Sequence, residues 1–182
     1  MGFRCTWVAV RGATRDPVLA QLRLAVERSA NEPVEDTGLY GLALPTGWYL
    51  AIGDGSDYMG HLDETDAVGL SRSCEALFFY TDDTPMATRL ACYRDGSLAW
   101  AINYEGVNGV AEPQIEGAAP PCTTEILAGL QKEQVDADGR REGVDFIYEL
   151  TADVAKALVG FRHDQTLAGG EVVPVDILNP VE

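Results

Sequence analysis

Lysine, histidine and long apolar runs are all scarce in this sequence. Of its 182 residues, only two are lysines and two are histidines. No run of about 18 consecutive apolar residues occurs, so we expect no transmembrane helix. The apolar patch before Arg11 spans only a few residues, which is too short for a signal peptide, and it predicts a first strand instead.

Cysteine is also infrequent, and the four cysteines Cys5, Cys74, Cys92 and Cys122 lie far apart. We expect them to be reduced and mostly buried thiols. A disulfide between Cys74 and Cys92 stays open as an alternative if their two strands pair. Nothing in this pattern requires a secreted setting, so we expect a protein of the bacterial cytoplasm.

The motifs of nucleophilic hydrolases and of phosphate-binding loops are missing. There is no GxSxG, and Ser56 beside Asp57 lacks the spacing of a nucleophile elbow. Gly53, Gly55 and Gly60 match neither GxGxxG nor GxxxxGK[ST]. We therefore assign no catalytic residue and expect no nucleotide cofactor.

Metal ligands at short spacing are missing as well. Zinc sites need paired His or Cys residues, and neither CxxC nor HxxxH occurs. The Asp-Ala-Asp-Gly stretch at 136–139 begins like a calcium loop but lacks the later ligands. His163 follows the end of an expected helix, where the helix dipole favours a cation, and we interpret it that way. We expect no cofactor and no bound metal.

Acidic residues are abundant, and the net charge is −16. Residues 35–83 carry ten acidic residues against one basic residue, and residues 103–138 carry seven against one. Such a surface repels nucleic acid and anionic membranes and attracts a basic protein face. A solvated acidic surface without a partner is the alternative. The candidate partner-binding residues are Asp54, Asp57, Asp63, Glu64, Asp66, Asp82 and Asp83.

The N-terminal part predicts a strand followed by a helix. Residues 5–12 are rich in strand-forming side chains. Asp16 is a good N-cap, and Pro17 suits the first helical position. Five apolar side chains then recur at helical spacing on one face, and they predict an amphipathic helix: Val18, Leu19, Leu22, Ala25 and Val26.

The middle of the chain predicts an antiparallel sheet. Residues 39–55 contain two strands broken at Pro45-Thr46-Gly47, and a short helix is expected around Glu64–Ser71. Three strands then follow in succession and form a meander. These strands cover 75–81, 86–93 and 97–104, with a tight turn at Asp95-Gly96. We expect the tryptophans of the predicted strands, Trp7, Trp48 and Trp100, in the core.

The C-terminal part predicts helices and two further strands. Residues 105–121 suggest a loop, 123–135 a helix and 136–143 a turn. Residues 145–150 suggest a strand, and Thr151 then caps a helix that Gly160 closes. The tail around Pro174 predicts an edge strand, because proline cannot donate to a sheet.

Together these elements predict one α+β domain over residues 1–182. Its antiparallel meander sheet has about five to seven strands. An N-terminal amphipathic helix and two shorter helices pack against that sheet.

Two segments, YRDGSLAWAINYEG (93–106) and FIYELTADVAKALVGFRHD (146–164), are similar to segments of small bacterial proteins encoded beside polymorphic toxins as immunity proteins. The resemblance covers about 33 residues, contains no functional motif and assigns no site residue. It implies a non-enzymatic protein that binds and blocks a partner. We therefore expect a protein-binding module for a basic partner. Two alternatives stay open: an enzyme using dispersed carboxylates, whose spacing only the fold sets, and a structural or small-molecule-binding domain.

Overall fold

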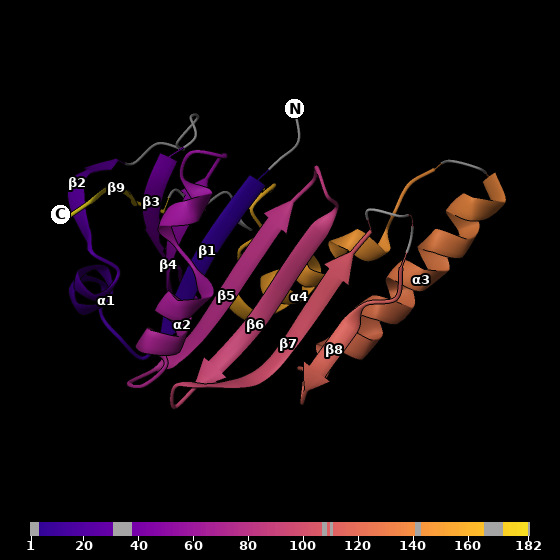
Figure 1. The fold of residues 1–182 in the computed structure, drawn as a ribbon, viewed down its shortest axis with the longest axis horizontal. Coiled ribbons are helices and arrows are strands. Elements are labelled where there is room, and N and C mark those ends of the chain that lie inside the picture. The colour runs from indigo at the N-terminus through magenta and orange to yellow at the C-terminus, as the bar shows by residue number, and fades with distance from the viewer. Residues whose placement is uncertain are drawn as a thin grey trace.

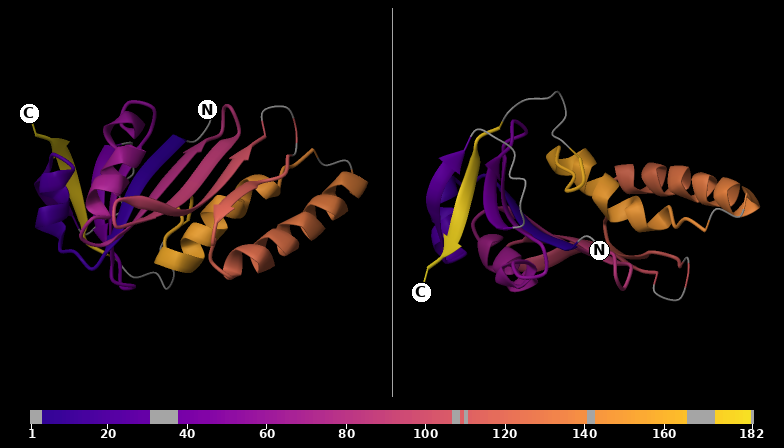
Figure 2. Two further views of the ribbon diagram at one scale, coloured as in Figure 1. Left: turned by 60° about the horizontal axis from the view of Figure 1, so that its bottom comes forward. Right: turned by 90° about the horizontal axis from the view of Figure 1, so that it is seen from above.

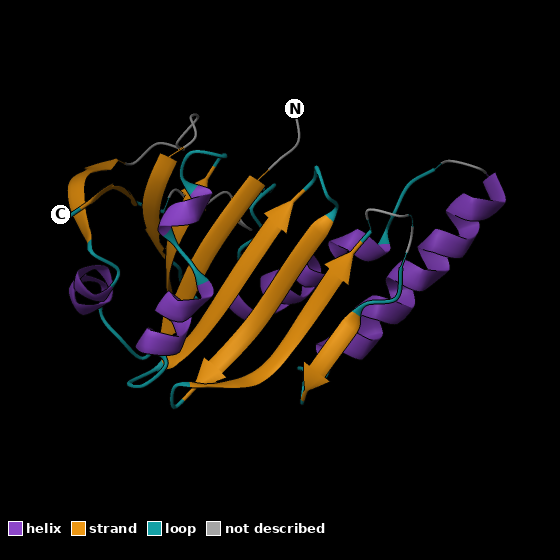
Figure 3. Cartoon of the chain, in the orientation of Figure 1, coloured by secondary structure: helices purple, strands orange, loops and turns teal. Residues whose placement is uncertain are grey.

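The structure, a computed structural model, describes residues 4–30, 38–106, 109, 111–140, 143–165 and 173–181. Within these ranges the chain forms nine strands and four α-helices (Figure 1, Figure 3). The strands are β1 Arg4–Arg11, β2 Leu24–Ala30, β3 Gly38–Ala43, β4 Trp48–Asp54, β5 Glu75–Asp82, β6 Ala87–Arg94, β7 Ser97–Glu105, β8 Gln114–Gly117 and β9 Val175–Pro180. The helices are α1 Arg15–Gln21, α2 Glu64–Leu70, α3 Cys122–Arg140 and α4 Leu150–Val159, with 3₁₀ turns η1 Met59–His61 and η2 Ile147–Glu149. None of these helices is both long and apolar enough to cross a membrane.

All nine strands form one open antiparallel sheet in the order β2-β9-β3-β4-β1-β5-β6-β7-β8. The α+β class and the antiparallel sheet are confirmed. The expected five to seven strands are too few. The chain adds β2 inside the predicted N-terminal helix and β8 inside the predicted loop 105–121.

The sheet separates two layers of helices. Helices α3 and α4 cover one face, and α1 and α2 lie on the other (Figure 2). Side chains of β1 alternate between them: Trp7 packs in the α3–α4 core, and Val8 in the α1–α2 core. This alternation is the period of a strand buried on both faces. The three tryptophans are buried as expected, with exposures of 1% for Trp7, 4% for Trp48 and 5% for Trp100.

The middle of the chain folds largely as predicted. The strand pair β3–β4 and the meander β5–β6–β7 form where the sequence indicates them. Between β6 and β7, Asp95 and Gly96 both have positive φ, 52° and 72°, which is the geometry of a primed two-residue turn. Helix α2 begins after Asp63, whose side chain forms a capping box with Asp66.

The predicted N-terminal helix is too long. Helix α1 ends at Gln21, its N-cap is Thr14 rather than Asp16, and Arg23 turns the chain with φ of 56°. Leu24–Ala30 then becomes β2, which pairs with β9 from the far end of the sequence. The pairing partner decides this segment. Leu24 and Val26 lie two residues apart on the inner face of β2, and Ala25 between them is exposed, which is the period of a strand.

Three predictions for residues 136–151 are wrong. No strand forms over 145–150, where η2 covers Ile147–Glu149 and Leu150 starts α4, and 136–140 belong to α3 rather than to a turn. Thr151 lies within α4, where its hydroxyl donates to Thr88 Oγ1 at 2.8 Å instead of capping the helix. The predicted end of α4 is confirmed, since Gly160 adopts φ of 83° at the C-cap.

The C-terminal strand lies inside the sheet and not at its edge. β9 hydrogen-bonds to β2 on one side and to β3 on the other. Pro174 lies just before the strand starts, so it removes no donor from the ladder.

All four cysteine thiols are free. Cys74 packs against the α1–α2 core, whereas Cys92 belongs to the α3–α4 core. The sheet therefore lies between them, and the alternative of a Cys74–Cys92 disulfide is wrong for this fold.

Candidate functional site

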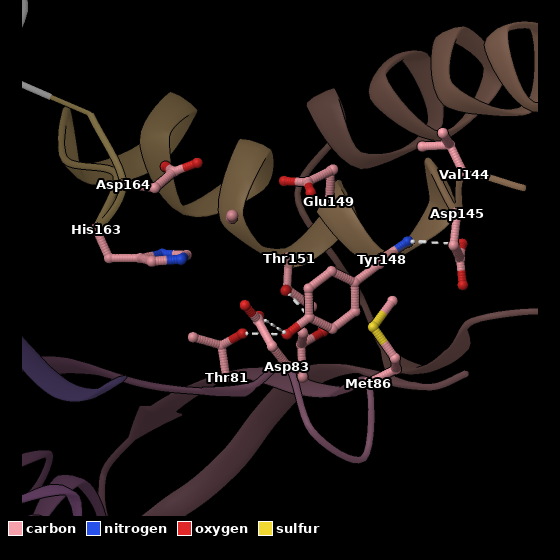
Figure 4. A pocket seen from close by; sticks show the side chains of 12 residues that line it. Thr81, Asp83, Met86, Val144, Asp145, Tyr148, Glu149, Thr151, His163 and Asp164 are labelled. Atoms are coloured by element: carbon pink, nitrogen blue, oxygen red, sulfur yellow. Dashed lines mark hydrogen bonds between the residues drawn. The ribbon is translucent and has the colours of Figure 1, made fainter. Parts of the chain in front are cut away.

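A cavity of about 410 Å³ lies on the α3–α4 face, where the ends of β5 and β6 meet η2 and α4. Figure 4 shows side chains from the sheet below and from the helical layer above converging on it. The sheet side contributes Thr81, Asp83, Met86 and Thr88. The helical side includes Asp145, Tyr148, Glu149, Thr151, His163 and Asp164. We call this cavity the acidic pocket.

The pocket is acidic because four carboxylates line it: Asp83, Asp145, Glu149 and Asp164. Among the described residues that line it, none is a lysine or an arginine. In a cavity walled by protein, where the dielectric is lower than in water, such an arrangement favours a cationic guest.

Tyr148 lies in the middle of the pocket (Figure 4). Its hydroxyl donates to Asp83 Oδ1 at 2.8 Å and lies 2.8 Å from Thr81 Oγ1. Its backbone amide donates to Asp145 Oδ1 at 3.3 Å. Burial raises the pKa of the phenol, so Tyr148 stays protonated and serves as a neutral donor.

A second tyrosine holds Asp145 in place. The hydroxyl of Tyr104, on β7, donates to Asp145 Oδ2 at 2.5 Å and accepts from the amide of Ala111 at 3.0 Å. Burial raises the pKa of Tyr104 to about 12. Neutral hydroxyl groups therefore orient both Asp83 and Asp145 without contributing a positive charge.

His163 points its ring into the pocket (Figure 4) and lies 5.4 Å from the ring of Phe79, centroid to centroid. Burial lowers the pKa of His163 to about 4. The residue is therefore neutral near pH 7, and the expectation of a histidine cation after the helix end is wrong. Desolvation outweighs the nearby carboxylate Asp164, which favours the charged form.

The cation at this helix end is Arg162. Its guanidinium, in a side chain only 10% exposed, hydrogen-bonds to three carboxylates, Glu149, Asp153 and Asp164. Burial opposes the ionised form of Asp164, but Arg162 outweighs that cost and lowers its pKa. Burial raises the pKa of Glu149 despite the same arginine. Arg162, which does not line the cavity, thus fixes two of the pocket carboxylates, Glu149 and Asp164.

Four of the seven acidic residues singled out from the sequence lie at one end of the sheet. Asp83 lines the pocket, and Asp82 accepts from Arg4 Nε at 3.1 Å and from the amide of Thr84 at 2.9 Å. Asp54 ends β4, where burial raises its pKa, and Asp57 is exposed in the following turn.

The other three acidic residues lie at the start of α2, on the opposite face. Asp63 and Asp66 cap the helix reciprocally. Glu64 accepts from the guanidinium of Arg89 and from the hydroxyl of Tyr93. Of the seven, therefore, only Asp83 lines the acidic pocket.

Sequence reasoning missed Asp145, Glu149 and Asp164. The spacing of the acidic residues could have indicated two of them, because Asp145 and Glu149 recur every four residues together with Asp153. That is the spacing of one helical face. It was hidden because the segment was interpreted as a strand.

Among the residues that the structure describes, no three His, Cys, Asp or Glu side chains are placed to hold a metal ion together. No known protein family model matches this chain, and no curated protein or solved structure shows significant similarity to it.

Proposed function

We propose that this protein is a non-catalytic binding module whose acidic pocket receives a cationic side chain from a basic protein partner. The observation that carries the proposal is the lining of the pocket. Four carboxylates line a cavity of about 410 Å³, and no lysine or arginine stands among the described lining residues. Glu149 and Asp164 pair with Arg162 outside the lining, whereas Asp83 and Asp145 are held by tyrosine hydroxyls. A cavity of that size lies within the range of small-ligand pockets, and it is sufficient for one lysine or arginine side chain.

Hydrogen bonding preorganises the pocket for a cation. Asp83 and Asp145 are each held by a tyrosine hydroxyl, so their carboxylates are oriented before a guest arrives. An incoming guanidinium would form charge-assisted hydrogen bonds to them, which are stronger than neutral ones. Binding would cost little conformational entropy in these side chains, because they are already fixed.

Long-range charge supports the same kind of partner. The chain carries −16 overall, and this field would speed its encounter with a basic surface. A narrower form of the proposal is an immunity-type inhibitor that blocks a basic toxin. The four free thiols suit the bacterial cytoplasm, where cysteines stay reduced, and we propose that compartment for its action.

The test uses two charge-matched variants. Asp83→Asn with Asp145→Asn removes two charges from the pocket while keeping an acceptor oxygen for each tyrosine hydroxyl. Glu133→Gln with Asp136→Asn removes two charges from the exposed side of α3 and serves as the control. Wild type and both variants are used to capture proteins from extracts of the native cell, and the captured proteins are identified by mass spectrometry.

We expect a basic protein to be captured by wild type and by the α3 variant but not by the pocket variant. With that protein purified, its association with wild type should slow as salt concentration rises. A partner captured equally by all three proteins would contradict the pocket as the contact. A partner that binds equally at low and high salt would contradict the electrostatic mechanism.

A further inference from the structure

A second cavity lies at the opposite end of the α3–α4 face, and it differs in chemistry from the acidic pocket. It measures about 480 Å³ and lies where β1, β4, β5, β6 and β7 meet the segment before α3. In Figure 1 this is the end of the sheet at which β1 finishes and β7 begins. We call it the arginine pocket.

The floor of the arginine pocket is apolar and packed in the core. Trp48 and Trp100 line it together with Leu77 and Cys92. These four side chains are 4%, 5%, 2% and 1% exposed, so all belong to the packed core. The apolar surface open to a guest above this packed base comes from exposed or half-buried lining residues: Ala118, Ala119, Pro120, Pro121 and Leu158.

The rim of the pocket carries two arginines that share one carboxylate. Arg11 and Arg94 both donate to Glu75, Arg94 through Nε at 3.1 Å and Arg11 through its terminal nitrogen. Burial opposes ionisation of Glu75, but hydrogen bonds and charges from Arg94 and Arg11 outweigh it and lower its pKa. The trio therefore carries two positive charges and one negative charge.

The two guanidinium groups retain donors for a guest. Each arginine offers about five N–H groups, and Glu75 has only two oxygens to accept them. The side chains of Arg11 and Arg94 are 56% and 59% exposed. The Arg11 guanidinium also lies 4.9 Å from the centroid of a Trp48 ring, which places a cation directly beside the apolar floor.

We propose that the arginine pocket binds a small organic monoanion with a flat apolar body, of the class of aromatic carboxylates or sulfonates. The ring system would lie between residues 118–121 and Leu158, above the packed base of the cavity, and the anionic group would accept hydrogen bonds from Arg11 and Arg94. Planar guanidinium groups suit planar carboxylates better than lysine does. The chain has a net charge of −16, so most of its surface repels an anion, whereas the positive rim of this pocket attracts one.

The test compares a charged probe with an uncharged probe of similar shape. The charged probe is 8-anilinonaphthalene-1-sulfonate, and the uncharged one is N-phenyl-1-naphthylamine. Both are titrated into the folded full-length protein, and probe fluorescence is followed. We expect one saturable site for the sulfonate on wild type.

Removing the positive rim should separate the two probes. In the double variant Arg11→Gln with Arg94→Gln, we expect the Kd of the sulfonate to rise about tenfold or more, as lost charge-assisted hydrogen bonds predict. The Kd of the uncharged probe should change by less than about twofold, because its apolar contacts remain. Equal losses for both probes would overturn the role of the arginines.

Filling the cavity should remove both probes. Ala119→Phe places a ring over the pocket from the loop before α3, and Ala118→Phe, at an exposed neighbour, replaces it if the first variant lowers the thermal midpoint. The control is Val144→Phe, which adds the same ring at the acidic pocket, where Val144 is 45% exposed. Sulfonate binding that survives the filled arginine pocket, or the absence of saturable binding to wild type, would overturn the proposal. Neither result bears on the proposed protein partner, which uses the other pocket.

Discussion

The acidic pocket and the arginine pocket occupy opposite ends of one sheet face, and they use arginine in opposite ways. Along β1, Arg4 pairs with Asp82 near the acidic pocket, and Arg11 pairs with Glu75 at the arginine pocket. Seven residue steps of a strand separate these ends by roughly 23 Å. One continuous core therefore supports both cavities.

The difference between the pockets lies in how far each arginine is buried. Arg162, behind the acidic pocket, is 10% exposed and has three carboxylate partners. Arg11 and Arg94 are more than half exposed and share a single carboxylate. A buried arginine surrounded by carboxylates is a structural counter-charge. An exposed arginine with spare donors is available to a ligand.

The largest expected effect follows from this contrast. Arg162→Met should lower the free energy of unfolding by about 2–4 kcal/mol, because three partly buried carboxylates lose their cation. Arg94→Met should cost less than about 1 kcal/mol, as is usual for an exposed ion pair. Urea unfolding near pH 7 measures both. Similar losses of unfolding free energy in the two variants would contradict the difference between a structural Arg162 and a ligand-accessible Arg94.

The stability of the protein should depend on pH through His163 in the acidic pocket. His163 has a folded pKa of about 4, below its ordinary 6.5, so the unfolded chain binds the extra proton between those values. The contribution of the neutral ring to stability is complete above pH 6.5 and is lost as pH falls toward 4. The size of that loss is about 3 kcal/mol.

His163→Phe should therefore change the shape of the stability curve. The variant keeps the surrounding charges Asp83, Asp164 and Arg162. The stability that the variant loses in acid therefore measures the contribution of all groups other than His163. Wild type should lose more stability than the variant between pH 7 and pH 4.5. Parallel curves from urea unfolding across this range would mean that His163 is not buried in the neutral form.

A smaller effect is expected at the turn that leads from Arg94 into β7. Gly96→Ala should cost about 1 kcal/mol, because alanine is strained at φ of 72°. Gly129→Ala is the matched control in α3, where an added Cβ meets no atom within 4 Å. That change should stabilise the protein by about 0.5–1 kcal/mol. Denaturation midpoints that move in the same direction would contradict the turn geometry.

The smallest expected effect concerns metal ions at the acidic pocket. Adding calcium or zinc, or removing metals with EDTA, should leave the thermal midpoint unchanged. A ligand that binds only the folded state would raise it. A reproducible rise of the thermal midpoint with calcium, which Asp83→Asn abolishes, would show that the acidic pocket binds a metal ion. It would contradict the proposed protein partner.

Local sequence information was sufficient for much of the sheet. The two-residue period over 75–104, the Asp95-Gly96 turn and the helix end at Gly160 each depend on neighbours in the chain. Their signals are strand periodicity and residues that tolerate positive φ. The burial of the three tryptophans followed from the same strands.

Long-range pairing decided the rest. Leu24–Ala30 carries an apolar pattern that suits a helix or a strand, and β9, some 150 residues later, selects the strand. The candidate sites belong to this second class. Asp83 meets Asp145 and Glu149 only because α4 packs over the ends of β5 and β6, and Arg11 meets Arg94 only across β5. The sequence by itself determined the acidity, the meander and its turns, because those depend on composition and adjacent residues. Only the tertiary structure decided which charges share a cavity, because that depends on contacts between residues far apart in the chain.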